Sequence, residues 1–275
     1  MAQIKELWSA RHEEHLARFL RAVEVDDVVE ASLALDMGAR DAWDAAVEAA
    51  LPRLRRARDA GMAMGVAAEI ASLFEREWRV ELDPCAEVAR EGEVSSAFAL
   101  RSASPRTLAL MWAHVARRVG MKACWLEMSV FHPLRLWDED SEVLVDTTSG
   151  ALVSPRDCQE IFAAVTEGEE IFEPSMLDNP SARSVACSIL EFRLAGAIMS
   201  GDEIDRWRVA RFHVELKRDH DETLFAAAMN AMSVGDYGFA QSALEELTIR
   251  CAGTSLEGPV RQGLEALRLR QQYAN

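Results

Sequence analysis

The side chains that could do chemistry in this sequence gather between residues 104 and 146. His132 lies at a predicted strand junction in SVFHPLRL, and Asp146 ends the following predicted strand in VLVDTTSG. In an antiparallel pair such positions can lie side by side, so that the carboxylate orients the imidazole of a Cys-His-Asp triad. The nucleophile would come from the N-terminus of a preceding helix, where the helix dipole lowers the pKa of a thiol.

The helix in the right place for that nucleophile begins with Ser104 and Pro105 and has no cysteine there. Ser104 could serve as a hydroxyl nucleophile, but a serine before a helix-opening proline is more simply an N-cap. Cys124 lies eight residues before His132 on a predicted strand, where a buried and inert thiol is the simpler interpretation. A catalytic role for either residue stays an alternative.

Residues 105–119 form the helix that must position these groups. Apolar residues recur at helical spacing and predict one buried face, made of Leu108, Met111, Trp112, Val115 and Val119. The polar residues of this helix are expected to face elsewhere; they are Arg106, His114, Arg117 and Arg118. The segments KACWLEMSVF, PLRLW and VLVD then predict two or three antiparallel strands, with the acidic turn DEDSE as a hairpin tip.

Helices are predicted on both sides of this sheet. Residues 1–70 are rich in Ala, Leu, Glu and Arg at helical spacing, and residues 181–275 divide into helix-length runs separated by short turns. In GDYGFAQSALEEL, the spacing of Tyr237, Ala240 and Leu244 is that of the second helix of a tetratricopeptide unit. The Pro-containing segment EPSMLDNPS predicts a linker before the C-terminal helices.

The composition excludes several classes of function. The chain has 275 residues, 49% of them hydrophobic, and a net charge of -16 from 46 acidic and 30 basic residues. Binding to a phosphate backbone needs clustered Lys and Arg, so we expect neither a nucleic acid nor an anionic membrane surface as partner. There is no long apolar run and no signal-peptide pattern, so we expect a cytoplasmic protein without membrane insertion.

The cysteines and histidines do not predict a metal site. The five cysteines form no CxxC pair, which argues against a zinc knuckle and a disulfide framework. His12 and His15 share a helix face without a third ligand, and His213 and His220 lie on a charged helix. The DEDSE run lacks the ligand spacing of a calcium loop, and no glycine-rich phosphate loop is present. We therefore expect no metal and no cofactor.

The central segments resemble the SirB-type transglutaminase-like proteins of bacteria. In that family a helix of the form R-R-G-I-P-I-S-L-x-L-L-Y-x-x-V-A-R-R-L-G-L precedes a P-G-H-F segment and an I-D-P-F-x-G-G-x-x-L motif. PRTLALMWAHVARRVGM, FHPLRL and LVDTTSGALVSPRDC match these in order, over about residues 30–165. The matching positions are Leu73, Phe74, Pro105, Leu108, Ala116, Arg117, Arg118, Gly120, His132, Asp146, Gly150 and Leu152. The family usually adds tetratricopeptide-like helices afterwards.

The resemblance implies a fold whose chemistry has lost its nucleophile. In transglutaminases and related cysteine proteases the helix N-terminus carries the catalytic cysteine, which SirB-type proteins generally lack. Here residues 103–106 read ASPR where the family has G-I-P-I, and the segments around His132 and Asp146 also depart from its motifs. The inherited His132 and Asp146 are expected to be vestigial.

These observations predict a mostly helical α+β fold with a small antiparallel sheet in a degenerate transglutaminase-like core. The expected parts are a helical N-terminal region (1–70), the core (71–175) and an all-helical, tetratricopeptide-like region (181–275). The expected function is that of a non-catalytic adaptor or scaffold, whose acidity favours a basic or mixed-charge protein partner. One alternative is a cysteine-type hydrolase or amidase that uses an atypical thiol with His132 and Asp146. The other is a structural subunit of a larger assembly.

Overall fold

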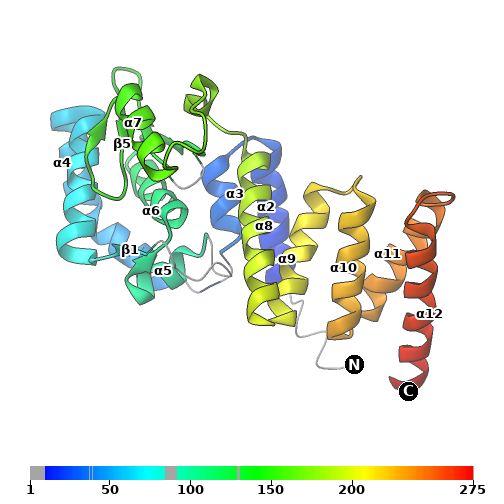
Figure 1. Ribbon diagram of the computed structural model, residues 1–275. Helices are drawn as coiled ribbons and strands as arrows, with labels where there is room; N and C mark the ends of the chain where they lie inside the picture. Colours follow the sequence, from blue (N-terminus) through cyan, green and yellow to red (C-terminus); the bar gives the residue numbers. More distant parts are fainter. Residues whose placement is uncertain (1–9, 37, 39, 84–91, 129–130, 275) are drawn as a thin grey trace. The chain divides into compact units, whose positions relative to one another are not determined.

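Helices make up most of the protein, and short strands form two small sheets, so the expected α+β class is confirmed. The computed structural model describes residues 10–36, 38, 40–83, 92–128 and 131–274 (Figure 1). Its contacts define two compact units. One unit is Arg18–Ala186, and the other joins Met1–Ala17 to Cys187–Asn275.

The N-terminal helices are α2 (Ala10–Glu24), α3 (Val28–Ala34) and the long α4 (Asp41–Ser72), which runs into a π-helical turn, η1 (Leu73–Trp78). Asp27 caps α3 by accepting a hydrogen bond from the Glu30 N–H. Helix α4 is kinked at Met62, whose φ of 52° and ψ of -139° are not helical. Trp43 of α4 and Trp78 of η1 meet edge to face, with ring centroids 5.0 Å apart.

Helix α6 (Pro105–Arg118) is the central helix of the larger unit. It packs against α3, α4, α5 (Val94–Leu100) and strands β3 and β4 described below. The expectation that its polar residues face away from the core is wrong for Arg106 and His114, which are both buried. Because protein surrounds the first three turns of this helix, no side of them faces solvent.

The main sheet is antiparallel and has the strand order β3 (Lys122–Trp125), β4 (Leu134–Trp137), β5 (Glu142–Val145), β6 (Leu152–Val153). Its register pairs Trp125 with Leu134 and Leu134 with Val145. A second sheet pairs β1 (Glu81–Leu82) with β2 (Ser102–Ala103) in parallel. Strand β2 leads directly into α6. Its pairing with β1 therefore fixes the chain just before the start of α6.

The two faces of the main sheet cover different helices. Leu144 packs with Cys158 and Phe162 of helix α7 (Pro155–Val165), so one face is the α7 face. The next residue along the strand, Val145, points to the opposite face because successive side chains alternate, and its cross-strand partner Leu134 points to the same face as Val145. Val145 and Leu134 therefore belong to the opposite face, which we call the α6 face. Helix α7 itself begins at a capping box formed by Ser154 and Asp157.

The chain after α7 passes through a short 3-10 helix, η3 (Pro174–Leu177), in the expected linker. The remaining helices are α8 (Ala182–Ser200), α9 (Glu203–Leu216), α10 (Asp221–Val234), α11 (Tyr237–Arg250) and α12 (Glu257–Ala274). Figure 1 shows α10, α11 and α12 following one another as a row of helices. Ala228, Ala231 and Ala240 are fully buried where α10 and α11 meet, and Gly235 (φ 86°) turns the chain between them.

Among the described residues, no helix is both long enough and apolar enough to cross a membrane.

Candidate functional site

The N-terminus of α6 is held by a network of hydroxyl groups. Ser104 is the N-cap: its Oγ accepts a hydrogen bond from the Thr107 N–H (3.1 Å) and donates one to Thr107 Oγ1 (2.9 Å). The Gly92 N–H in turn donates to Thr107 Oγ1 (2.9 Å). The predicted N-cap is confirmed, and both the donor and an acceptor position of the Ser104 hydroxyl are in use.

Arg106, which follows the helix-opening proline, is buried and forms an ion pair with the part-buried Glu127. Arg106 donates to both carboxylate oxygens of Glu127, with 3.0 Å from Nη2 to Oε2 and 3.3 Å from Nε to Oε1. The Trp125 indole N–H donates to the same carboxylate over 2.7 Å. Only 7% of the Arg106 side chain is exposed. Burial alone would raise the pKa of Glu127, but the charge of Arg106 and the hydrogen bonds outweigh it and lower that pKa.

His132 is buried, and the charges of this ion pair act on it. Burial lowers its pKa to about 4; the charge of Glu127 opposes that shift, and the charge of Arg106 adds to it. Its Nδ1 is buried and has no hydrogen-bond partner within the part of the chain that the structure describes. His132 is thus a neutral imidazole at neutral pH. The charges that act on it are those of Glu127 and of Arg106, which lies on α6.

Both carboxylate oxygens of Asp146 accept hydrogen bonds from the turn that follows it. Its Oδ1 accepts hydrogen bonds from the N–H and the hydroxyl of Thr148 (2.9 and 2.7 Å), and its Oδ2 accepts one from the Ser149 hydroxyl (2.6 Å). These contacts make an Asx turn that ends β5. In the described residues no hydrogen bond or ion pair joins Asp146 to His132.

The pleat of the sheet explains why these two residues are not paired. Leu134 pairs with Val145, so His132, two residues earlier, follows the α6 face, and Asp146, one residue later, follows the α7 face. The electrostatic neighbours agree with this assignment. Arg106 of α6 influences the pKa of His132, whereas Asp146 is among the charges that help burial to raise the pKa of Cys158, on α7, to about 11.

Cys124 is also on the side of the sheet away from His132. It pairs with Arg135, and Arg135 pairs with Leu144, so the thiol belongs to the α7 face. It is 5% exposed, and its Sγ donates weakly to the Trp125 carbonyl at 3.4 Å. Burial raises the pKa of this thiol to about 12. Of the other cysteines, Cys158, Cys187 and Cys251 are not part of a disulfide, and Cys85 lies outside the described residues.

No hydrogen bond or ion pair in the described part of the chain joins any two of the four candidate residues, so they do not form a triad. A sequence model of the transglutaminase-like superfamily matches residues 41–191, from the start of α4 into α8, and the match includes all four. The chain belongs to the transglutaminase-like superfamily. No curated protein and no solved structure gives a significant match to it.

Within this transglutaminase-like domain, sequence reasoning missed Arg106 and Glu127. Arg106 was expected on an outward face of its helix, and Glu127 lies just beyond a strand that is otherwise apolar. One signal was available: a lone acid at the end of an apolar strand and a lone base in the first turn of an apolar helix are each costly to bury unless they pair. Among the described residues, no group of three or more side chains could hold a metal ion.

Proposed function

We propose that this chain is a non-catalytic protein-interaction module, an adaptor or scaffold built on a degenerate transglutaminase-like fold. The observation that carries the proposal is the Arg106–Glu127 ion pair at the start of α6. The resemblance to cysteine transglutaminases assigns the nucleophile to this part of the helix. Here a guanidinium and a carboxylate neutralise each other, and the neighbouring imidazole is buried.

The geometry speaks against the hydrolase alternative. A thiol nucleophile must reach its histidine within hydrogen-bond distance and must form a thiolate near neutral pH. Cys124 and His132 belong to opposite faces of the sheet, and the pKa of Cys124 is raised to about 12. The Ser104 hydroxyl is the N-cap of α6 and both donates a hydrogen bond to Thr107 and accepts one from it. None of these groups has the environment of an activated nucleophile.

The C-terminal helices supply the proposed interaction region. The alanine-lined contact between α10 and α11 and the turn at Gly235 support a tetratricopeptide-like unit. Within this proposal residues 71–175 are the transglutaminase-like core of a SirB-type protein, residues 181–275 are the tetratricopeptide-like region, and residues 1–70 are a helical N-terminal region. The net charge of -16 favours a basic or mixed-charge partner.

The first test measures thiol reactivity peptide by peptide with iodoacetamide between pH 5 and 9. We expect Cys124 to react slowly throughout and His132→Ala to leave its rate unchanged. A fast-reacting thiol with an apparent pKa well below about 8.5, slowed by His132→Ala, would replace the proposal with the hydrolase.

The second test addresses binding directly. The full chain is used as bait at low salt, beside the double variant Cys124→Ser with His132→Gln. We expect both baits to retain the same partner at a fixed stoichiometry, because the proposal assigns no role in binding to these two groups. Recovery of no partner, or loss of the partner with the double variant, would overturn it.

A further inference from the structure

A pocket of about 490 Å³ lies between α6, η1, β1 and the turn that follows β5. Its volume is within the range of small-molecule sites in proteins. We call it the Trp112 pocket; besides Trp112, its lining includes Phe74, Val80, Leu108, Thr147 and Gly150. Every lining residue belongs to the Arg18–Ala186 unit, and none of the four candidate residues described above is among them.

The inner wall of this pocket is aromatic and apolar. Trp112 of α6 stacks on Phe74 of η1, with ring centroids 5.5 Å and ring planes 21° apart. Leu108, one turn earlier on α6, and Val80 are also buried. A Cβ added at Gly150 would lie 3.9 Å from Cη2 of Trp112, so the indole reaches from α6 to the turn after β5.

Two buried residues in this lining carry polar groups that have no hydrogen-bond partner in the described part of the chain. Trp112 is 1% exposed, and its indole N–H is one of these groups. Thr147 is 4% exposed, and its hydroxyl is the other. The indole N–H can only donate, and the hydroxyl can donate or accept. Because an unpaired polar group is costly to bury, a bound oxygen that accepts from these donors would be favourable.

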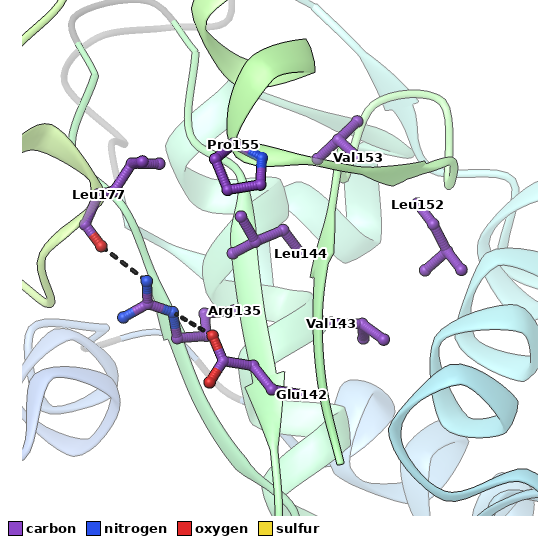
Figure 2. Close-up of a pocket in the computed structure, with 8 residues that line it drawn as sticks. All are labelled: Arg135, Glu142, Val143, Leu144, Leu152, Val153, Pro155 and Leu177. Carbon is purple, nitrogen blue, oxygen red and sulfur yellow. Dashed lines mark hydrogen bonds and ion pairs between the residues drawn. The ribbon is translucent and has the colours of Figure 1, made fainter. Parts of the chain in front are cut away.

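The groove beside β5 and β6 lacks this feature (Figure 2). It measures about 350 Å³, and its two charged side chains are linked to their surroundings. Arg135 donates to the Leu177 carbonyl over 2.7 Å, and its Nε lies 3.2 Å from Glu142 Oε1. The other side chains of its lining are apolar. The Trp112 pocket, by contrast, offers unpaired polar groups that could orient a ligand.

The charged side chains of the Trp112 pocket are at its exposed side. Glu75, Arg79 and Glu81 line the pocket and are all exposed, whereas Trp112 and Thr147 are buried. A charged group at the inner wall would therefore leave water without a buried counter-ion, which is unfavourable. The inner wall favours an uncharged ligand.

We propose that the Trp112 pocket binds an uncharged, largely apolar small molecule whose carbonyl or hydroxyl oxygens accept hydrogen bonds from Trp112 and Thr147. The apolar body of the ligand packs against Phe74, Val80 and Leu108. Its oxygens take the place of the partners that these two donors lack within the protein. This inference goes beyond the proposed interaction module and does not depend on it.

The test uses the full chain and prodan, an uncharged naphthalene ketone whose fluorescence shifts to shorter wavelength in an apolar site. Three competitors share the naphthalene ring: 2-acetylnaphthalene has a carbonyl, 2-isopropylnaphthalene has nearly the same shape without oxygen, and 2-naphthoate is an anion. We expect saturable binding of prodan and its displacement by 2-acetylnaphthalene. The anion should displace it at least about tenfold more weakly, because its charge would have to be buried.

A filling variant locates the bound probe. Ala71 lines the pocket, and Ala71→Leu should weaken prodan binding at least about tenfold because the larger side chain occupies the space. Val143→Leu, which enlarges a side chain in the groove of Figure 2, is the matched control and should leave binding unchanged. Thermal melting checks that both variants are folded.

Two further variants each remove one polar group. Thr147→Val removes the hydroxyl, and Trp112→Phe removes the indole N–H. In at least one of them the preference for 2-acetylnaphthalene over 2-isopropylnaphthalene should fall about two- to tenfold. Thr166→Val, a hydroxyl change on α7 outside the lining, should leave that preference unchanged. Because the Thr147 hydroxyl has no protein partner, Thr147→Val should lose no thermal stability.

Three results would overturn the Trp112 pocket as a ligand site. They are the absence of saturable prodan binding, unchanged binding in folded Ala71→Leu, and the same ketone preference in Thr147→Val and Trp112→Phe as in the unchanged chain. The last result would mean that water alone meets the two polar groups. If Ala71→Leu does not fold, the two polar variants still decide the question.

Discussion

Trp43 of α4 donates its indole N–H to Nδ1 of His114 on α6 over 2.8 Å, and both side chains are buried. This hydrogen bond joins residues 71 positions apart and requires Nδ1 to carry no proton. The rings also lie close, with centroids 5.9 Å apart. The central helix is thus fixed to α4 by a neutral imidazole.

Acid should weaken the fold through this pair. Burial and then nearby arginines lower the pKa of His114 from 6.5 to about 4, and burial does the same for His132. Between these values the unfolded chain binds protons that the folded chain does not, so stability is full above about pH 6.5 and falls toward pH 4. Each histidine contributes on the order of 3 kcal/mol at most. Urea unfolding at several pH values should show a shallower loss for His114→Gln, and no such change for the exposed His220→Gln.

The Arg106–Glu127 ion pair should behave as a unit. Arg106→Met leaves the part-buried carboxylate of Glu127 without its counter-ion and should cost up to about 3 kcal/mol, the lower end of the range for a fully buried pair. The double variant Arg106→Met with Glu127→Leu should recover much of that loss, because it removes both charges. Urea unfolding of the two single variants and the double variant completes the cycle. Additive losses would contradict the pairing.

Glycine substitutions at two methionines near the kink in α4 should change the stability of the fold in opposite directions. Met62 has a positive φ, which costs a side-chain-bearing residue about 1–3 kcal/mol, so Met62→Gly should stabilise the fold by about 1 kcal/mol. Met64→Gly, in the same helix without a positive φ, should destabilise it by about 1 kcal/mol. Thermal unfolding of both variants provides the comparison, and a loss of stability in Met62→Gly would contradict the kink.

The turn after Asp146 should tolerate no side chain at Gly150. Its φ is 72°, and an added Cβ would lie 2.8 Å from the Cβ of Ala71 on α4. Gly168 has a similar φ of 77° but open space around it, so Gly168→Ala measures the backbone cost alone, about 1 kcal/mol. Gly150→Ala should cost more than that by chemical denaturation. Equal losses would mean that the turn can move away from α4.

The close contact between α10 and α11 should reject larger side chains. Ala228 is fully buried against this contact, and Ala228→Leu should destabilise the C-terminal unit by about 1–3 kcal/mol through overpacking. Ala226, two residues earlier on the exposed side of α10, is the matched control and should accept leucine with little change. Hydrogen exchange of α10 and α11 in the full chain reports the difference.

Most helices, strands β3, β4 and β5 and the N-cap at Ser104 could be predicted because their signals are local, whereas the two-residue strands β1, β2 and β6 were not predicted. Helical spacing, a Ser-Pro pair and short apolar segments act within a few residues of one another. The relation between His132 and Asp146 was harder to predict, since both lie just outside the strands and their faces depend on a register that only the folded sheet defines. The burial of Arg106 depends on Glu127, 21 positions away, which no local pattern links to it.

The Arg106–Glu127 ion pair also limits which substitutions this site can accept during evolution. A catalytic group is kept because each residue is needed for turnover, and it can be lost one residue at a time once turnover no longer matters. A buried ion pair harms folding when either partner changes alone. Positions 106 and 127 are therefore expected to vary together in descent, as a charged pair or as an apolar pair, whereas no hydrogen bond or ion pair among the described residues couples positions 132 and 146 in this way.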